Sequence, residues 1–328
     1  MDWRELVNAG LSRTAGYQLT RPPGHPSRRL PPPTGDRMLR APVFILSPAR
    51  SGSTLLRVVL GSHSRLYAPP ELPLMHMTVR AETRWIQTSM RELELTQESL
   101  DNTLWDAVLA DVLARSGKPV VVAKTPSNAV IWRRIADCWP DARFIFLLRH
   151  PAAVVASLLA SWHPDWNMKV SGTLGDITRN ALWYMRKVEE ARRALPGITV
   201  RYEELTEDPE QVTRRVCEYL GERFEPAMLD YGKFSHARFA PGLGDCSENI
   251  RSGRIRQSAP PPRLAEVPPA LAEMCATWDY SQPGTETQAG TGTQAGTGTQ
   301  QGTGARRGSG SDLDGEYRRE AASPADSV

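Results

Sequence analysis

The sequence predicts an α/β protein in which one parallel sheet is flanked by helices, and three observations support this prediction. Short runs rich in β-branched and other apolar residues alternate with helical patterns, as in doubly wound parallel sheets. The runs are apolar throughout, which is typical of strands buried on both faces. The first run leads through a glycine-containing loop into a helical pattern, in the manner of a phosphate-binding loop.

Four strands are predicted in chain order, at 43–47, 119–123, 142–148 and 198–202. Helical patterns lie between and after them. Two of these patterns have favourable first residues, because Pro151 suits the first helical position and Asp208 suits an N-cap. The predicted helices are 53–62, 128–139, one that starts at residue 151, 177–195 and 209–220.

Composition divides the chain into three parts. Residues 1–40 contain the Pro- and Arg-rich segment RPPGHPSRRLPPPTGDR, which predicts a flexible lead-in. Residues 41–280 hold the predicted strands and helices and are interpreted as a single domain. Residues 281–328 carry a six-residue repeat of Thr, Gln, Ala and Gly with almost no apolar side chain, which predicts a disordered tail.

The charge and cysteine content exclude several classes of function. With 328 residues and a formal charge of only +3, the chain has no global excess of positive charge for nucleic acid or a membrane surface. No apolar stretch reaches the roughly 18 residues of a membrane helix, and the N-terminus lacks a signal-peptide pattern. The four cysteines are scattered, which predicts no metal site. We therefore expect a cytoplasmic protein whose oligomeric state the sequence does not indicate.

The loop SPARSGST resembles a Walker A phosphate-binding loop but departs from it at two positions. Gly52 and Thr54 match the pattern G-x-x-x-x-G-K-[ST], whereas Ser47 replaces the first glycine and Ser53 replaces the lysine. A strand, a glycine and a helix N-terminus still offer backbone N–H groups to an anion. Taken alone, the loop could also be an ordinary turn between a strand and a helix.

The donor groups of this loop, and the residue at the end of a neighbouring strand, indicate which anion the loop binds. Arg50 supplies a fork of donors suited to phosphate or sulfonate oxygens, and Ser51 adds a hydroxyl group. A phosphoryl-transfer site normally has an aspartate at the end of a neighbouring strand to hold Mg²⁺, but in the run RFIFLLRH that place is taken by Arg149. Cations from side chains, in place of a metal, favour transfer of a group with less charge than a terminal phosphoryl, such as sulfuryl.

A second strand–loop–helix pattern occurs in LLRHPAAVVASLLASW. Arg149 ends the strand, the helix begins at Pro151, and Ser157 lies eight residues after the arginine (157 − 149 = 8). Arg149 and Ser157 flank the start of the helix, so together they could bind one phosphate group. Taken singly, each residue is better explained as a capped surface arginine or a helical serine.

These two motifs, in this order and about a hundred residues apart, resemble the sulfotransferases that use 3′-phosphoadenosine-5′-phosphosulfate (PAPS). The resemblance covers roughly residues 41–280 and implies a P-loop-like parallel sheet with PAPS as co-substrate. The segment PARSGSTLL resembles the family's 5′-phosphosulfate loop, and the pair Arg149 and Ser157 resembles its 3′-phosphate motif. The loop contacts that this implies are Arg50, Ser51, Gly52, Ser53, Thr54 and Leu55.

Two further segments resemble parts of this family. VRYEELTEDPE is similar to the segment whose tyrosine packs beside the adenine, which implies this role for Tyr202. ENIRSGRIRQ is similar to the late loop that closes over the 3′-phosphate, which implies contacts from Ser252, Gly253 and Arg254. Because the second motif is short, a polar surface loop stays an alternative for it.

The expected general base differs from that of the cytosolic small-molecule sulfotransferases. Their Lys-Thr-His run resembles AKTPSN, but Pro126 stands in the place of the histidine that acts as base, and proline cannot accept a proton. The tyrosylprotein sulfotransferases carry an arginine in the loop and a glutamate after the first helix. Arg50 and Glu71, 21 residues apart (71 − 50 = 21), resemble that pair. The resemblance implies Glu71 as base, with Arg50 and Lys124 stabilising charge on the leaving group.

The sequence leaves the acceptor unknown, whether small molecule, glycan or peptide tyrosine. Segments 72–90 and 161–170, which contain Met and Trp residues, are candidates for its pocket, although such residues also build cores. Two other functions stay open: a Mg²⁺-dependent P-loop kinase of small molecules, and a nucleotide-binding protein without catalytic activity. The missing Walker lysine and strand-end aspartate argue against the kinase.

Overall fold

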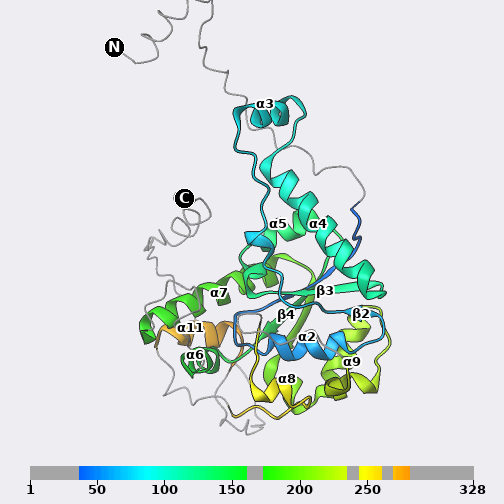
Figure 1. The fold of residues 1–328 in the computed structure, drawn as a ribbon. Helices are drawn as coiled ribbons and strands as arrows, with labels where there is room; N and C mark the ends of the chain where they lie inside the picture. The colour runs from blue at the N-terminus through cyan, green and yellow to red at the C-terminus, as the bar shows by residue number, and fades with distance from the viewer. Residues whose placement is uncertain (1–36, 161–172, 235–243, 261–268, 281–328) are drawn as a thin grey trace, which may run out of the picture. The chain divides into compact units, whose positions relative to one another are not determined.

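The protein contains a five-stranded parallel sheet, described in a computed structural model that covers residues 37–160, 173–234, 244–260 and 269–280 (Figure 1). All of these residues belong to one compact unit. The strand order is β2-β3-β1-β4-β5. The strands are β1 (Val43–Leu46), β2 (Leu66–Tyr67), β3 (Val120–Lys124), β4 (Arg143–Leu148) and β5 (Gly197–Arg201). The predicted α/β class with a parallel sheet is confirmed.

Helices cover both faces of the sheet because its strands are apolar on both sides. In β1, Val43 and Ile45 join one buried cluster, and Phe44 and Leu46 join another. The first cluster lies under α2 (Ser53–Gly61), α8 (Tyr202–Glu207), α9 (Pro209–Tyr219) and η3 (Pro226–Lys233). The second lies under α4 (Gln97–Ser116) and α5 (Trp132–Cys138).

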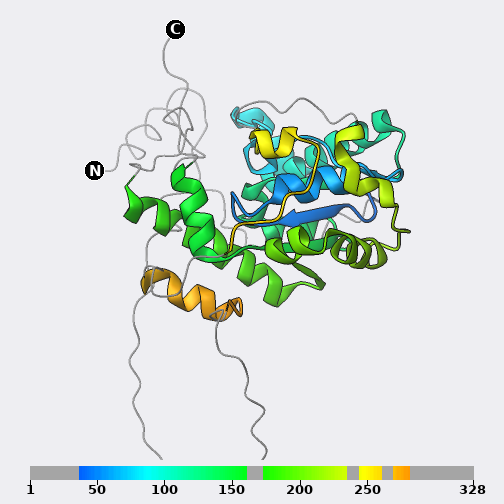
Figure 2. The same ribbon diagram turned by 90° about the horizontal axis from the view of Figure 1, so that it is seen from below.

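A third buried cluster forms at the end of β4, where Leu148 leads into helix α6 (Pro151–Ala160). Apolar residues of α6 pack there against α7 (Leu174–Ala194) and α11 (Pro269–Thr277). Figure 2 shows α11, in orange, beside the green helices. Helix α3 (Arg84–Glu92) lies apart from the sheet, beyond the N-terminal end of α4 (Figure 1). The short elements are η1 (Leu74–His76), η2 (Pro126–Ala129) and α10 (Glu248–Arg251).

All four predicted strands and all five predicted helices are present, with shifted ends. Asp208 caps α9 as predicted, because its Oδ1 accepts a hydrogen bond from the Gln211 N–H at 3.0 Å. The predicted helix 128–139 is divided, since its first residues belong to η2 and α5 begins at Trp132. The sequence prediction missed β2, α3, α4, α8 and α11. Strand β2 has only two residues, which is too short for a periodic pattern.

The parallel arrangement brings five separate chain segments to one edge of the sheet, because the carboxyl ends of parallel strands all point the same way. The loop 47–52 follows β1, and the segment with Glu71 follows β2. Lys124 ends β3, Arg149 follows β4, and Tyr202 follows β5. Among the helices of the described ranges, none is both long enough and apolar enough to span a membrane. The predicted lead-in and tail lie almost wholly outside the described residues.

Candidate functional site

The loop between β1 and α2 adopts a conformation that depends on glycine at residue 52. Gly52 has φ = 84°, a left-handed conformation that glycine adopts without steric cost. A Cβ atom at this residue would lie 2.1 Å from Cδ2 of Tyr202, so the tyrosine ring packs directly on the loop. Arg50 is also left-handed, with φ = 64°. The loop and the N-terminus of α2 follow the carboxyl end of β1, and a helix N-terminus offers backbone N–H groups to an anion.

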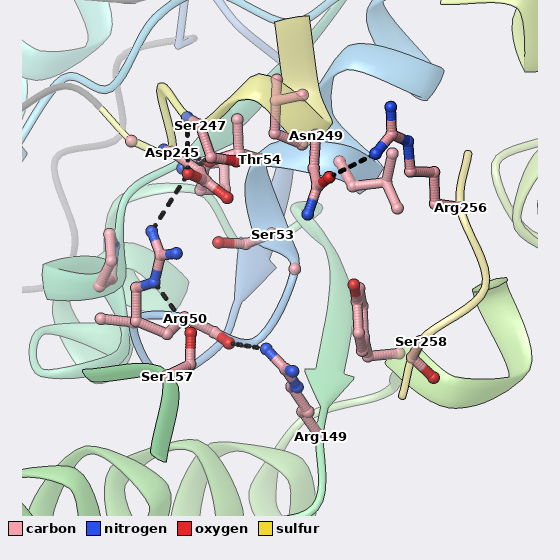
Figure 3. Close-up of a pocket in the computed structure, with 18 of the residues that line it drawn as sticks. Arg50, Ser53, Thr54, Arg149, Ser157, Asp245, Ser247, Asn249, Arg256 and Ser258 are labelled. Carbon is pink, nitrogen blue, oxygen red and sulfur yellow. Dashed lines mark hydrogen bonds and ion pairs between the residues drawn. The ribbon is translucent and has the colours of Figure 1, made fainter. Parts of the chain in front are cut away.

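A cavity of about 710 Å³ lies at this edge (Figure 3). It has the size of a pocket for a nucleotide or a similar ligand. Eleven of the residues predicted from the sequence line it: Arg50, Gly52, Ser53, Thr54, Leu55, Glu71, Lys124, Arg149, Ser157, Tyr202 and Arg254. The structure thus gathers residues that are up to about two hundred positions apart in the chain.

One part of the cavity is built around Arg50. Its Nε donates to Ser157 Oγ at 3.2 Å, and its Nη1 lies 3.3 Å from Oδ1 of Asp245. Nη1 of Arg149 donates to the carbonyl oxygen of Arg50 at 2.8 Å (Figure 3). The first loop and the Arg149–Ser157 pair therefore form one continuous basic surface.

Tyr202 lies on the same wall as Arg149. The Arg149 guanidinium stacks over the Tyr202 ring at 4.5 Å from the ring centre, within the range of a cation–π contact. Burial raises the pKa of the Tyr202 hydroxyl, and the nearby Arg149 charge partly opposes this shift. A neutral, rigid ring beside two guanidinium groups suits stacking against a planar base.

The other part of the cavity holds an ion pair between Lys124 and Glu71. Lys124 Nζ also lies 3.3 Å from Thr54 Oγ1. The side chains of Lys124 and Glu71 are only 1% and 11% exposed. Burial lowers the pKa of Lys124, and the adjacent Glu71 carboxylate opposes that shift. Gly244 packs over this trio, because a Cβ on it would lie 2.9 Å from Thr54 Oγ1 and 3.1 Å from Glu71 Oε1.

Three predicted contacts do not line the cavity. Ser51 is fully buried, and its hydroxyl has no hydrogen-bond partner among the described residues. Ser252 is exposed and donates to the carbonyl of Asn249 at 2.7 Å. Gly253 has φ = 71° and is buried against Gly232, where a Cβ would lie 2.5 Å from the Gly232 Cα. Of the three contacts predicted in the late loop (Ser252, Gly253 and Arg254), only Arg254 lines the cavity.

A second group of lining residues was not predicted from the sequence, and it comes from the same late segment. Residues 244–259 form one side of the cavity and contribute Asp245, Ser247, Asn249, Arg256 and Ser258 among others. The Tyr231 hydroxyl holds this segment, at 3.3 Å from the Asn249 carbonyl and 3.2 Å from that of Arg254. The two arginines of the run RIRQ, Arg254 and Arg256, could have indicated that this segment lines the cavity. From the sequence, a ligand contact was assigned to Arg254 only.

Neither of the two segments predicted to form the acceptor pocket is seen to line the cavity. Met75, Met77 and Trp85 of segment 72–90 do not line the cavity, and Trp85 is 86% exposed on α3. Residues 161–170 lie outside the described residues. Within the described ranges, no group of three or more His, Cys, Asp and Glu side chains could hold a metal ion.

Replacing Asp245 with Asn is expected to tighten the binding of adenosine 3′,5′-bisphosphate by up to about fivefold, because the Arg50–Asp245 ion pair competes with a bound anion. Asparagine keeps an oxygen to accept the Ser247 N–H, which lies 3.0 Å from Asp245 Oδ1, so the segment should stay in place. Calorimetric titration of both proteins measures the change. Unchanged or weaker binding in the variant would contradict this competition.

The chain matches one protein-family model, described as the sulfotransferase family, over residues 42–226. The match covers more than half of the 328 residues. Among curated relatives, a putative protein-tyrosine sulfotransferase of Caenorhabditis briggsae is 25% identical over 199 residues, covering 58% of this chain and 68% of that protein. The nodulation protein NoeE of Sinorhizobium fredii is 28% identical over 216 residues, covering 57% of this chain.

The chain spans only part of some relatives. It aligns with 51% of NoeE and with 30% of an uncharacterized protein of Aquifex aeolicus that is 29% identical. Among solved structures, the sulfotransferase domain of the Synechococcus PCC 7002 olefin synthase is similar, with a TM-score of 0.50 and 25% identity. That similarity covers 75% of this chain and 98% of the domain.

Proposed function

The chain belongs to the sulfotransferase family, and from that premise we propose that it transfers a sulfuryl group from PAPS to an acceptor hydroxyl or amine. One observation carries the proposal. The cavity joins a surface formed by two arginines, Arg50 and Arg149, and the Ser157 hydroxyl to a buried Lys124–Glu71 pair. The two arginines suit the binding of a bisphosphate. The Lys124–Glu71 pair suits removal of the acceptor proton and stabilisation of charge on the leaving group.

The residues at the carboxyl edge fit PAPS as a substrate. The N–H donors of Arg50, Lys124 and Arg149 suit an anion with several phosphate and sulfate oxygens, although Arg50 and Lys124 are also paired with Asp245 and Glu71. The hydroxyl of Ser51, which has no hydrogen-bond partner among the described residues, lies in the loop that would receive the phosphosulfate, although Ser51 itself does not line the cavity. Tyr202, stacked under Arg149, would place its ring beside the adenine. PAPS supplies the activated sulfuryl group, and the chain supplies orientation, positive charge and a base.

In the proposed reaction the acceptor oxygen attacks sulfur in line with the leaving group. The bond from sulfur to the bridging phosphate oxygen breaks as the new sulfur–oxygen bond forms, and the acceptor proton passes to the Glu71 carboxylate. Negative charge develops on the 5′-phosphate of the leaving adenosine 3′,5′-bisphosphate. Lys124 and Arg50 would stabilise that charge, and the burial of Lys124 strengthens the interaction.

The charges around Lys124 favour sulfuryl over phosphoryl transfer. The cations Arg50 and Lys124 are each paired with a carboxylate, Asp245 and Glu71 respectively, so this end of the cavity has little net charge. A terminal phosphoryl group carries more negative charge than a sulfuryl group, and two nearby carboxylates would repel it. The kinase alternative is therefore disfavoured by these residues.

Adenosine 3′,5′-bisphosphate is expected to bind without Mg²⁺ and about 10- to 100-fold more tightly than AMP, since Arg149 would add a charge-assisted hydrogen bond to the 3′-phosphate. Arg149→Gln should remove most of this preference, whereas Arg115→Gln, which changes an exposed arginine of α4, should retain it. Calorimetry with the two nucleotides measures both effects. Equal affinity of the wild-type protein for the two ligands would overturn the 3′-phosphate assignment.

The acceptor is best sought with PAPS labelled in its sulfuryl group and a panel of chemically distinct acceptors. The panel should include 4-nitrophenol, a primary alcohol, an amine and an acidic peptide containing tyrosine. The peptide is included because a relative is named as a putative protein-tyrosine sulfotransferase. Label transferred to one member supports the proposed function, and binding of adenosine 3′,5′-bisphosphate without transfer to any member favours the non-catalytic alternative.

A further inference from the structure

The segment that carries Glu71 is anchored at several points along residues 68–79. At its start, Nη1 of Arg57 donates to the carbonyl oxygens of Ala68 and Pro69 at 3.1 and 3.4 Å. Arg57 is buried, which lowers its pKa, and the Glu71 charge opposes that shift. Directly after Glu71, the Thr125 hydroxyl donates to the carbonyl of Leu72 at 3.2 Å. The backbone is therefore hydrogen-bonded to helix α2 before Glu71 and to the residue that follows β3 after it.

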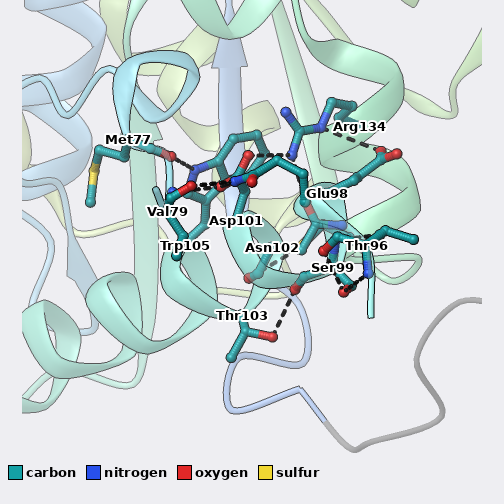
Figure 4. Close-up of polar contacts among 12 residues, drawn as sticks. Met77, Val79, Thr96, Glu98, Ser99, Asp101, Asn102, Thr103, Trp105 and Arg134 are labelled. Atoms are coloured by element: carbon teal, nitrogen blue, oxygen red, sulfur yellow. Dashed lines mark hydrogen bonds and ion pairs between the residues drawn. The ribbon is translucent and has the colours of Figure 1, made fainter. Parts of the chain in front are cut away.

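The far end of the segment is anchored to helix α4 by two buried side chains (Figure 4). The indole N–H of Trp105 donates to the carbonyl of Met77 at 2.8 Å. The backbone N–H of Val79 donates to Oδ1 of Asp101 at 2.8 Å. Gln97 donates to the same Asp101 oxygen at 2.9 Å. None of these α4 side chains lines the cavity.

Arg134 of α5 joins the two anchors into one network. Its Nη2 lies 3.7 Å from Asp101 Oδ2, and its guanidinium stacks at 4.3 Å from the centre of the Trp105 ring. Nη2 also donates to the Asn102 side chain at 3.2 Å, and Nε lies 3.3 Å from Glu98. The rotamers of Asp101 and Trp105 are therefore fixed from the side opposite the anchored segment (Figure 4).

Burying a carboxylate such as that of Asp101 has an unfavourable free energy of desolvation. Asp101 is 3% exposed, and removing a carboxylate from water is unfavourable unless hydrogen bonds and an opposite charge compensate for it. An apolar side chain would pack against the core without that cost. What the carboxylate adds is a directed bond to one backbone N–H, that of Val79, which defines where the segment lies.

We propose that Asp101 and Trp105 are positioning residues for the Glu71 segment, and the inference rests on the proposed function. They hold the backbone at residues 77–79, while Arg57 and Thr125 hold it at 68–72, so the segment 68–79, which contains Glu71, is restrained at both ends. A shift of about 1 Å in a reacting group can reduce the rate about a hundredfold. Anchors outside the cavity therefore control transfer without contacting donor or acceptor.

Helix α4 itself offers a matched control. Asp106 is a second buried carboxylate on the same helix, 5% exposed, and it also accepts backbone N–H groups. Its bonds go to Met38 and Leu39 at 2.7 and 3.2 Å, and to the Trp139 indole at 2.8 Å. Asp101→Ala and Asp106→Ala thus remove the same chemical group from the same helix. Asp101→Ala releases the backbone at Val79, whereas Asp106→Ala releases it at Met38 and Leu39.

The experiment compares Asp101→Ala, Asp101→Asn, Trp105→Phe and Asp106→Ala in the full chain. Asp101→Ala is expected to reduce kcat about 10- to 100-fold with the panel acceptor that the wild type uses best. Its affinity for adenosine 3′,5′-bisphosphate should stay within about twofold of the wild type, because the nucleotide contacts are unaltered. Asp101→Asn keeps an oxygen for Val79 and should recover most of kcat, and Trp105→Phe should fall between the two.

Hydrogen exchange provides a readout that does not depend on activity. Amides of residues 74–79 should exchange faster in Asp101→Ala and Trp105→Phe, but at the wild-type rate in Asp106→Ala. Equal losses of kcat, or equal exchange at 74–79, in Asp101→Ala and Asp106→Ala would overturn the positioning role. A wild-type protein that sulfates no acceptor contradicts the proposed function instead, and the exchange comparison still decides whether Asp101 holds the segment.

Discussion

Glu71→Gln is expected to reduce sulfuryl transfer about 10²- to 10⁴-fold while leaving the binding of adenosine 3′,5′-bisphosphate nearly unchanged. The amide cannot accept the acceptor proton, so the variant lacks the proposed base. It retains an oxygen that can accept a hydrogen bond from Lys124, so the cavity should keep its shape. Single-turnover transfer with labelled PAPS and calorimetry with the bisphosphate measure the two quantities separately.

Glu225→Gln is a suitable control for the Glu71 variant. Glu225 accepts the Ser64 N–H at 2.9 Å and does not line the cavity, so its replacement tests the effect of a lost carboxylate away from the site. Transfer by Glu225→Gln should stay near the wild-type rate. If Glu71→Gln also retained full turnover, Glu71 would be excluded as the base, and Asp245 would become the carboxylate to test in its place.

Lys124→Met is expected to lower both activity and stability. Loss of a cation beside the leaving group should reduce kcat about 10²- to 10³-fold, as for removal of one donor from an oxyanion hole. The variant also leaves Glu71 as an unpaired, largely buried charge, and breaking a buried pair in this way costs about 3–5 kcal/mol. Urea titration monitored by circular dichroism measures the change in the free energy of unfolding.

The double variant Glu71→Gln/Lys124→Met separates the two effects. With both charges of the pair removed, neither Glu71 nor Lys124 is left as a buried ion without the other, so most of the lost stability should return. Transfer should stay absent because both the base and the cation are missing. Stability that does not recover would show that Lys124 contributes through packing rather than through its charge. Recovered transfer would contradict the assignment of both residues.

The sheet and much of the candidate site could be predicted because the burial of each strand and the direction of parallel strands leave a visible pattern in the sequence. A strand such as Arg143–Leu148, buried on both faces, must be apolar along its whole length, and that run is visible in the sequence. Parallel strands also require their carboxyl ends to meet. Arg50, Lys124 and Arg149 each lie at or just after a strand end, so the sheet topology alone brings them to one cavity.

Other features could not be predicted because they depend on contacts between distant residues. Asp245 enters the cavity through its ion pair with Arg50 and the bond from its N–H to Thr54 Oγ1, and nothing in the surrounding sequence indicates either partner. Ser252 lies in the expected motif but points its hydroxyl at Asn249. Helix α4 begins with a capping box from Thr96 and Ser99, in place of the more familiar Glu or Gln at the third position.

Strand β2 is the shortest strand of the sheet and lies at its edge, with two residues paired to β3 alone. The segment that leads from it carries Glu71. Edge elements with few backbone bonds open at lower free energy than central ones. Because β2 contributes so few backbone bonds, we expect the side-chain anchors of the following segment to decide the temperature at which Glu71, the proposed base, leaves the site.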